Sequence, residues 1–264
     1  MADIENFLKE ERSFPPPVEF AGAAVLGNAA EVDAMRRTAL EDPEGFWERV
    51  AERLPWFDRW HTVLDWEPPF AKWFVGGKIN ASTVCLDAHL EDRGTKTAIL
   101  WEGEPGEVRA VTYAELHEEV CRLANALEGL GVAAGDRVAI YMPMVPELAA
   151  SLLACARIGA THSVVFGGFS ADALRDRIQD MQAKCVITAD GGFRKGEPLP
   201  LKPAADEAIA QCPTVKHQIV LHRAGNQVDW TEGRDHDYAE LVAAASRHHE
   251  AVPLDAEHPL FTLY

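Results

Sequence analysis

Short apolar segments alternate with segments of helical periodicity through most of this chain, and no other feature constrains the fold as strongly. Apolar segments that predict strands lie at residues 137–141, 162–166, 185–189 and 215–221. Between them apolar residues recur at helical spacing, and glycine or proline marks most of the boundaries. Strands that alternate with helices in this way pair as βαβ units. We therefore expect an α/β fold, with a mostly parallel sheet and flanking helices.

Specific residues mark where the helices begin and end. Thr112 is followed three residues later by Glu115, which is the pattern of a capping box at a helix start. Pro146 suits the first turn of a second helix, and Gly159 suits its end. Ser170 is expected to cap a third helix. Further segments expected to be strands are residues 97–101, 108–111 and 261–264.

The first 80 residues differ from the rest of the chain. They hold five of the seven tryptophans and two proline-rich stretches, and they show short helical patterns without strand periodicity. We expect a helical, tryptophan-rich N-terminal extension over residues 1–80, followed by an α/β portion over residues 81–264. Tryptophan buries a large apolar surface, so we interpret these residues as packing anchors rather than ligand-stacking groups. They are Trp47, Trp56, Trp60, Trp66 and Trp73.

The charge of the chain excludes several classes of partner. It has 25 lysines and arginines against 42 aspartates and glutamates, which gives a net charge of −17. Such a surface repels phosphate backbones and anionic lipid, and no basic run is longer than the pair Arg36 and Arg37. No apolar segment is long enough to span a bilayer. We therefore expect no nucleic acid and no membrane as a partner.

Cysteine usage and the first residues indicate the cytoplasm. Five cysteines is an odd number, and no C-x-x-C spacing suggests a disulfide framework or a zinc site. We expect free, mostly buried thiols in a reducing compartment. The acidic start of the chain lacks the basic and apolar regions of a signal peptide. The cysteines are Cys85, Cys121, Cys155, Cys185 and Cys212.

Candidate binding residues lie where the predicted strands end, because ligands of open α/β sheets bind at the carboxyl ends of the strands. Gly167 and Gly168 follow Phe166 at one of these ends and precede a helix. Glycine lets the backbone approach a ligand closely, and the free amides of a helix start attract anions. The same glycines are also compatible with a tight turn that binds nothing. The loops at the strand ends are residues 142–147, 167–171 and 190–202.

The third of these loops holds the best local anion site of this acidic chain. Arg194 and Lys195 lie side by side between glycines. A guanidinium presents a fork of donors to phosphate oxygens, and an ammonium adds a second positive charge. The alternative is a solvated loop in which Arg194 pairs with a nearby carboxylate such as Asp190. The residues alone thus indicate an α/β body with an anion-binding edge.

Several other kinds of site are not indicated. The dinucleotide fingerprint G-x-G-x-x-G is absent, which counts against an NAD-dependent oxidoreductase. The sequence also contains no G-x-S-x-G, no Walker A motif and no H-E-x-x-H. No two histidines have the i, i+4 spacing of a zinc site with a third ligand nearby, so no metal-binding residue is assigned.

Several blocks of sequence are familiar as a set. They include residues 97–103 (TAILWEG), 141–147 (YMPMVPE), 153–160 (LACARIGA), 162–170 (HSVVFGGFS) and 186–190 (VITAD). These blocks resemble AMP-forming acetyl-CoA synthetases, which are members of the adenylate-forming superfamily, and several are specific to the acetyl- and propionyl-CoA branch. The resemblance runs from about residue 14 to residue 264. It implies that the α/β body is part of the large N-terminal domain of such enzymes.

The resemblance implies a two-step ligase reaction. Acetate attacks the α-phosphorus of ATP, with Mg²⁺, to give acetyl-AMP and pyrophosphate, and the thiolate of CoA then displaces AMP. In the family a phosphate loop follows the segment that resembles residues 259–264. We therefore expect this chain to be an N-terminal fragment that is inactive alone. No catalytic residue is assigned, because the family's catalytic residues are expected after Tyr264.

The resemblance also implies that part of a CoA site lies in this chain. Arg194 matches the family's phosphate-binding arginine, and the matching loop holds the nucleotide end of CoA. Relatives usually carry lysine or arginine where this chain has Glu197, so either Lys195 substitutes for it or CoA binds less tightly. The glycines at 167 and 168 flank the route to the active centre. The residues assigned to CoA are Phe166, Gly167, Gly168, Arg194, Lys195, Gly196 and Glu197.

Two alternatives remain open at this point. A propionyl-CoA synthetase fits the same blocks, because the residues that select the acyl group are expected outside this chain. A non-catalytic CoA-binding or assembly module, with the tryptophan-rich extension as an oligomer interface, also fits. Both a monomer and a homo-oligomer are compatible with the sequence.

Overall fold

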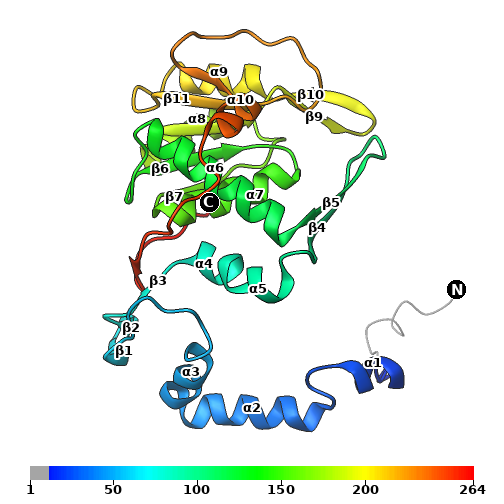
Figure 1. Cartoon of the computed structure of the whole chain (residues 1–264), viewed down its shortest axis with the longest axis vertical. Coiled ribbons are helices and arrows are strands. Elements are labelled where there is room, and N and C mark those ends of the chain that lie inside the picture. The colour runs from blue at the N-terminus through cyan, green and yellow to red at the C-terminus, as the bar shows by residue number, and fades with distance from the viewer. Residues whose placement is uncertain (1–11) are drawn as a thin grey trace, which may run out of the picture. The chain divides into compact units, whose positions relative to one another are not determined.

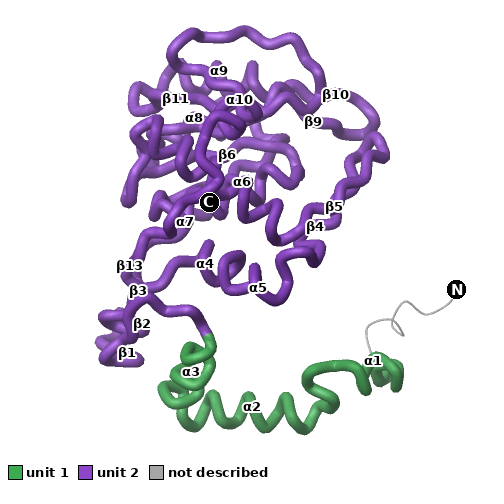
Figure 2. Tube along the Cα trace, viewed as in Figure 1, with its two compact units in different colours: residues 1–53 green, residues 54–264 purple. Residues whose placement is uncertain are grey.

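A computed structural model describes residues 12–264, and the chain divides into two compact units, residues 1–53 and 54–264 (Figure 2). Most of the acidic start that argued against a signal peptide therefore lies outside the described residues. The described part of the first unit contains the helices α1 (Val18–Ala23), α2 (Ala29–Glu41) and α3 (Pro43–Ala51). Asn28 caps α2 and Asp42 caps α3, since each side chain accepts the amide N–H three residues further on.

The second unit begins with an antiparallel hairpin of β1 (Thr62–Glu67) and β2 (Phe70–Val75). The expectation of a helical extension without strands over residues 1–80 is therefore wrong in its second half. Pro68 and Pro69, which indicated an irregular loop, form the turn that joins the two strands. Much of the hairpin is exposed, so its residues lack the alternation of apolar and polar side chains that predicts a half-buried strand.

The tryptophan interpretation is confirmed at Trp60 but not at every position. Trp60 is buried and packs edge to face against Trp56, with 4.9 Å between ring centroids, and against Phe74 at 5.1 Å. These aromatic contacts stabilise the start of the second unit. Trp66 is 62% exposed and Trp47 is 45% exposed, so neither is a buried anchor within its own unit.

A five-stranded parallel sheet forms the centre of the second unit, with the strand order β12-β11-β8-β6-β7 (Figure 1). The expected α/β fold with a mostly parallel sheet is confirmed. Strand β8 is buried along its whole length, which explains its continuous apolar sequence. The strands are β6 (Arg137–Tyr141), β7 (Thr161–Val164), β8 (Cys185–Ala189), β11 (His217–Leu221) and β12 (Asp235–Asp237).

Helices cover both faces of this sheet. Val138 and Ile140 of β6 pack with α6, α7 and α10, whereas Ala139 and Tyr141 pack with α8 and α9 on the other face. Alternate residues of β6 therefore pack into two separate hydrophobic cores, one on each face of the sheet. The helices are α6 (Tyr113–Gly129), α7 (Pro146–Ile158), α8 (Ala171–Met181), α9 (Lys202–Ile209) and α10 (Tyr238–Ala244).

The expected helix boundaries are confirmed. Thr112 and Glu115 form the capping box at the start of α6. Ser170 caps α8 by accepting the amide N–H of Ala173 at 3.3 Å. Gly159 ends α7 with a φ of +75°, a conformation that glycine adopts without strain. Before α6 the chain forms the short helices α4 (Ala81–Cys85) and α5 (Leu90–Arg93), with a 3₁₀ turn at Asp87–His89 between them.

Two further hairpins are important for the site. One is β4 (Thr97–Glu102) with β5 (Val108–Thr112), as expected. The other is β9 (Gly191–Arg194) with β10 (Glu197–Pro200), where an irregular loop was expected over residues 190–202. That expectation is corrected, because Arg194 and Glu197 face each other across a tight turn rather than lying in a loop.

Other chain segments complete the second unit. Strand β3 (Lys78–Ile79) pairs antiparallel with β13 (Leu254–Asp255). The strand expected at residues 261–264 is not formed, and Phe261 makes a single parallel bridge to His162. The cysteines are free and four of the five are buried, as expected. None of the helices over residues 12–264 has the length and apolar composition that a membrane span needs.

Candidate functional site

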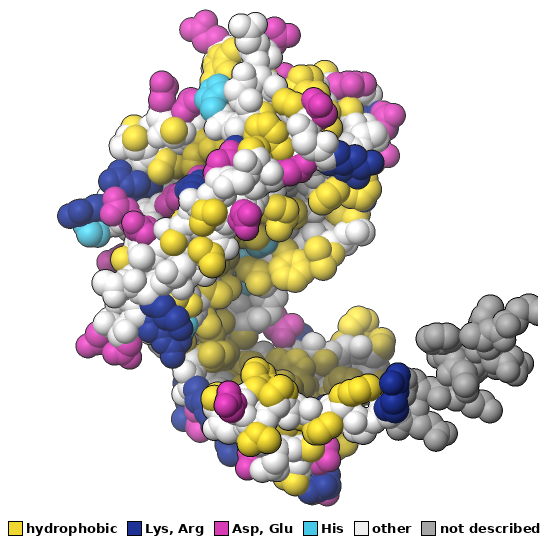
Figure 3. Space-filling view, turned by 90° about the vertical axis from the view of Figure 1, so that its right-hand side faces the viewer, with side chains coloured by type: hydrophobic (Ala, Val, Ile, Leu, Met, Phe, Trp, Pro, Cys, Tyr) yellow, Lys and Arg dark blue, Asp and Glu magenta, His cyan; other side chains and the backbone are white. Residues whose placement is uncertain are grey.

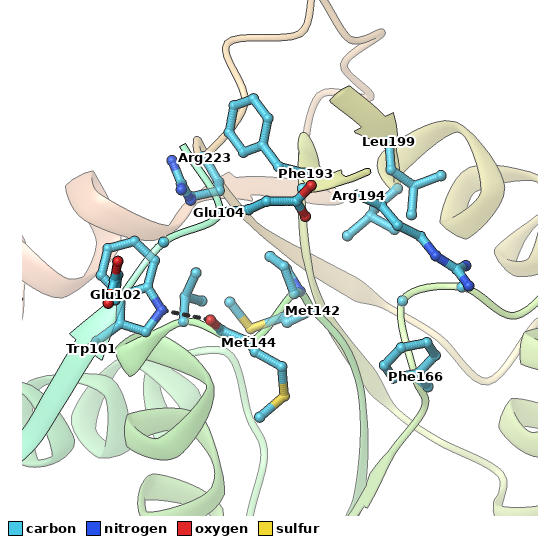
Figure 4. Close-up of a pocket in the computed structure, with 17 residues that line it drawn as sticks. Trp101, Glu102, Glu104, Met142, Met144, Phe166, Phe193, Arg194, Leu199 and Arg223 are labelled. Atoms are coloured by element: carbon cyan, nitrogen blue, oxygen red, sulfur yellow. Dashed lines mark hydrogen bonds between the residues drawn. The ribbon is translucent and has the colours of Figure 1, made fainter. Parts of the chain in front are cut away.

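A cavity of about 300 Å³ opens at the carboxyl end of the parallel sheet. Residues that follow four different strands line it: Met142 after β6, Phe166 after β7, Gly192 after β8 and Arg223 after β11. The β4–β5 hairpin contributes Trp101 to the opposite side (Figure 4). This is the position at which open α/β sheets bind their ligands.

The cavity has an apolar floor and a charged rim. Met142 and Leu201 are buried, and Pro143 and Leu199 extend the apolar surface. Charged side chains of both signs surround it: Arg194, Glu102 and Glu104 are exposed, and Arg223 is partly buried. The face of the molecule in Figure 3 shows basic side chains only in small separate groups. An anionic ligand therefore finds focused positive charge rather than a broad basic patch.

The structure brings the two expected anion-binding segments together. A Cβ atom on Gly168 would lie 2.7 Å from Nη1 of Arg194, so the guanidinium lies directly against the glycine backbone. Both residues line the cavity, as do Phe166 and Gly167. Within residues 12–264 the guanidinium of Arg194 has no ion-pair or hydrogen-bond partner. It is therefore available to an anion that enters the cavity.

The alternative in which Arg194 pairs with the carboxylate of Asp190 is wrong, because the two side chains do not interact. The Asp190 carboxylate is fully buried and accepts four backbone N–H groups from the loop at residues 223–226. Oδ1 accepts from Arg223 at 2.7 Å and from Ala224 at 2.9 Å, and Oδ2 accepts from Gly225 at 2.7 Å and from Asn226 at 3.0 Å. Asp190 thus fixes the loop that carries a second arginine into the cavity.

Arg223 is that second arginine, and the sequence did not single it out. Its guanidinium lies 4.8 Å from the ring centroid of Phe193 and 5.2 Å from that of Trp101. It also donates to both carboxylate oxygens of Glu107, at 2.9 and 3.1 Å. These hydrogen bonds lower the pKa of Glu107 below its ordinary value. Arg223 follows directly after β11, so applying the strand-end argument to every strand would have found it.

The β4–β5 hairpin forms one wall of the cavity and is fixed at its middle. Trp101 Nε1 donates to the carbonyl oxygen of Met144 at 2.7 Å (Figure 4). Arg109 lies over the Trp101 ring at 5.9 Å and donates to Glu147 at 2.6 Å. These contacts attach the hairpin to the loop before α7 and to the first turn of α7, so the wall has a defined position relative to the sheet.

The remaining expected site residues form the turn at the tip of the β9–β10 hairpin. Lys195 and Gly196 have positive φ values of 55° and 81°, as in tight two-residue hairpin turns. Lys195, Gly196 and Glu197 are exposed and do not line the cavity themselves. The Gly196 N–H donates to the carboxylate of Glu104, which does line it. The assignment of these seven residues to CoA stays a prediction.

The described residues contain no group of three His, Cys, Asp or Glu side chains that could hold a metal ion. A cavity with an unpaired guanidinium and an apolar floor can bind a ligand that carries both an anionic group and an apolar arm. The geometry therefore suits an anionic, partly apolar small molecule at the carboxyl end of the parallel sheet.

Comparison with known families identifies the class to which this fold and site belong. The model described as "AMP-binding enzyme" matches residues 86–264. The model described as "Acetyl-coenzyme A synthetase N-terminus" matches residues 32–85. The chain therefore belongs to the AMP-binding enzyme family. The expected boundary at residue 80 stays a prediction, since the compact units divide after residue 53 and the two family models meet after residue 85.

Individual relatives are more specific. The chain is 52% identical to the acetyl-coenzyme A synthetase of Deinococcus radiodurans over 264 residues, with 99% of this chain and 40% of the relative covered. It is 53% identical to the acetyl-coenzyme A synthetase of Streptomyces avermitilis with the same coverage. Its fold is similar to that of acetoacetyl-CoA synthetase from Streptomyces lividans, with a TM-score of 0.80, 30% identity, and 93% of this chain and 37% of that chain covered. The chain thus spans about 40% of the length of the curated relatives it matches.

Proposed function

We propose that the protein carrying this chain is an AMP-forming acetate–CoA ligase and that the cavity described above binds CoA. The relatives named acetyl-coenzyme A synthetase support the reaction. The unpaired Arg194 guanidinium, held against Gly168 above an apolar floor, supports the ligand. CoA carries phosphates at one end and an uncharged pantetheine arm at the other, which matches this division of the cavity.

The chain's own residues would bind and orient CoA. Arg194 donates to phosphate oxygens through charge-assisted hydrogen bonds. The floor around Met142 and Leu201 excludes water from the pantetheine arm and directs the thiol toward the acyl-adenylate. The thiolate then forms a bond to the acetyl carbonyl carbon as the bond from that carbon to the AMP oxygen breaks. ATP and Mg²⁺ supply the preceding activation of acetate, and no residue of this chain is assigned to them.

The location of the enzyme follows from the same proposal. Acetate, ATP and CoA are cytoplasmic small molecules, and the described chain has only free thiols. We therefore place the ligase in the cytoplasm, with small molecules rather than nucleic acid or lipid as its partners. Residues 81–264 would be the α/β portion that carries the CoA cavity.

The test replaces the unpaired guanidinium. In the whole protein that carries this chain, Arg194→Ala should raise the KM for CoA about tenfold or more, because it removes a hydrogen-bonded charge from the phosphate. Acetate-dependent exchange between ATP and pyrophosphate should not change, since CoA takes no part in it. Arg247→Ala is the control, because Arg247 is exposed and does not line the cavity.

Three results would contradict the proposal. A loss of exchange in Arg194→Ala would place the arginine in the first half-reaction. An unchanged KM for CoA would place CoA elsewhere. CoA binding by the wild type without AMP release from acetate or propionate would leave a non-catalytic CoA-binding module as the better account.

A further inference from the structure

A side chain joins the tips of the two hairpins that flank the cavity. Glu104 lies near the tip of the β4–β5 hairpin, and its carboxylate accepts the backbone N–H of Gly196 at the tip of the β9–β10 hairpin. Figure 4 shows this carboxylate reaching across the mouth of the cavity to lie between Phe193 and Arg194. The contact joins residues 92 positions apart in the sequence.

The Gly196 amide is an anion-binding group by its geometry. In a two-residue hairpin turn the flanking residues, here Arg194 and Glu197, pair with each other, and the amides of the two central residues stay outside the ladder. Successive residues with such turn conformations present their N–H groups to anions. The unpaired guanidinium of Arg194 lies two residues before this amide. Arg194 and Lys195 thus place positive charge beside a backbone donor that Glu104 occupies.

A carboxylate on this amide makes the interaction that a phosphate oxygen would make there. Both are anionic oxygen acceptors, and both form short, charge-assisted hydrogen bonds with backbone N–H groups. A ligand phosphate that binds the Gly196 amide must therefore meet the Glu104 carboxylate at the same donor. Two anions cannot share one N–H group at close range, since their mutual repulsion opposes it.

We propose that Glu104 is an internal competitor for the ligand phosphate, occupying the Gly196 amide in the free protein and leaving it when CoA binds. This inference rests on the proposed function of the cavity as a CoA site. It also gives the β4–β5 hairpin a role in binding, because displacing Glu104 breaks the direct hydrogen bond between the two hairpin tips. The middle of the hairpin stays in place through the contacts of Trp101 and Arg109.

The test compares two glutamates of the same hairpin. Glu104→Gln removes the charge but keeps the size of the side chain, and the neutral acceptor that remains binds an amide more weakly. Glu102→Gln removes the same charge from a residue that lines the same cavity but makes no contact with Gly196. The dissociation constants of CoA and of pantetheine, which has no phosphate, are measured by calorimetry with the whole protein.

We expect Glu104→Gln to bind CoA about five- to tenfold more tightly than the wild type. Pantetheine affinity should stay within about twofold. Glu102→Gln removes a rim charge that has no bond to Gly196, so it should tighten CoA binding less than Glu104→Gln does. Equal CoA affinity in Glu104→Gln and the wild type overturns the inference while leaving the CoA site intact. An equal gain in CoA affinity in Glu102→Gln also overturns the inference, because it would show a general effect of the cavity's charge. A gain in pantetheine affinity in Glu104→Gln overturns it too, because it would show easier access to the cavity.

Amide hydrogen exchange separates this inference from the proposed function. In the wild type, CoA should slow exchange at residues 194–197 and speed it at residues 103–106. If the wild type binds no CoA, the proposed function fails, and inorganic phosphate then serves as the probe. Phosphate that protects the Gly196 amide more in Glu104→Gln than in the wild type supports competition, whereas equal protection in both proteins refutes it.

Discussion

The loop that carries Arg223 depends on one buried carboxylate, and replacing it tests how the cavity is built. Asp190→Asn keeps the shape of the side chain but turns one acceptor oxygen into an NH₂ donor. Each oxygen of Asp190 accepts two backbone N–H groups, so the variant loses two hydrogen bonds. The new NH₂ group also points at the two N–H donors that have lost their acceptor. The remaining oxygen also loses its charge.

The magnitude follows from the burial and the number of bonds. A hydrogen bond to a charged group contributes about 1.5–3 kcal/mol, and a buried donor without an acceptor costs more than an exposed one. Asp190 is fully buried, so water cannot replace the lost acceptor. Two lost bonds therefore predict a decrease of about 3–5 kcal/mol in the free energy of unfolding. Few single substitutions reach the upper end of that range.

Urea denaturation measures the loss, and amide exchange locates it. We expect faster exchange at residues 223–226 and weaker CoA binding by the folded protein, because Arg223 is no longer held against Trp101. Asp229→Asn is the matched control, since Asp229 lies in the same connection and is exposed. It should change the free energy of unfolding by less than about 0.5 kcal/mol. A loss below about 1 kcal/mol in Asp190→Asn would refute the reasoning.

Two further predictions concern the glycine beside Arg194 and a half-buried histidine. Gly168→Ala should raise the KM for CoA about three- to tenfold, because the new Cβ displaces the end of the Arg194 side chain. The free energy of unfolding should fall by less than about 1 kcal/mol, since that side chain is flexible. An unchanged KM would contradict this. A hydrogen bond to Asp87 raises the pKa of His117 from 6.5 to about 9. The folded state therefore binds this proton more tightly, so the stabilisation is complete below about pH 6.5 and disappears as pH rises through 9. Urea midpoints at pH 6.5 and 9.5 should differ less in His117→Gln than in the wild type, and an equal difference would exclude His117 as the cause.

Four of the five strands of the central sheet could be predicted because they form continuous apolar segments, whereas β12 was not expected. Residues 185–189 are apolar or small throughout, as is typical of a strand that is buried on both faces. Helix starts were predictable for a local reason, as at Thr112, where the cap and its partner lie three residues apart. In both cases the stabilising interaction is encoded within a few residues of sequence.

The hairpins and half of the site could not be predicted in this way. No residue of the β1–β2 hairpin strands is fully buried, so burial imposes no clear alternation on their sequence. Arg194 and Gly168 were both candidates, but their contact depends on how β7 and β8 end in space. The pairing of Glu104 with Gly196 joins two hairpin tips that share no local pattern, and only the folded chain brings them together.

Thr112 has a double position, as the last residue of β5 and as the cap of α6. Because one residue ends the strand and caps the helix, the end of the β4–β5 hairpin at Thr112 is held in place by the long α6 helix. The far end is a turn at residues 103–107 with only side-chain attachments to its surroundings. The hairpin therefore behaves mechanically as a cantilever, and we expect stiffening or lengthening of its free end to alter ligand exchange rates before it alters the fold.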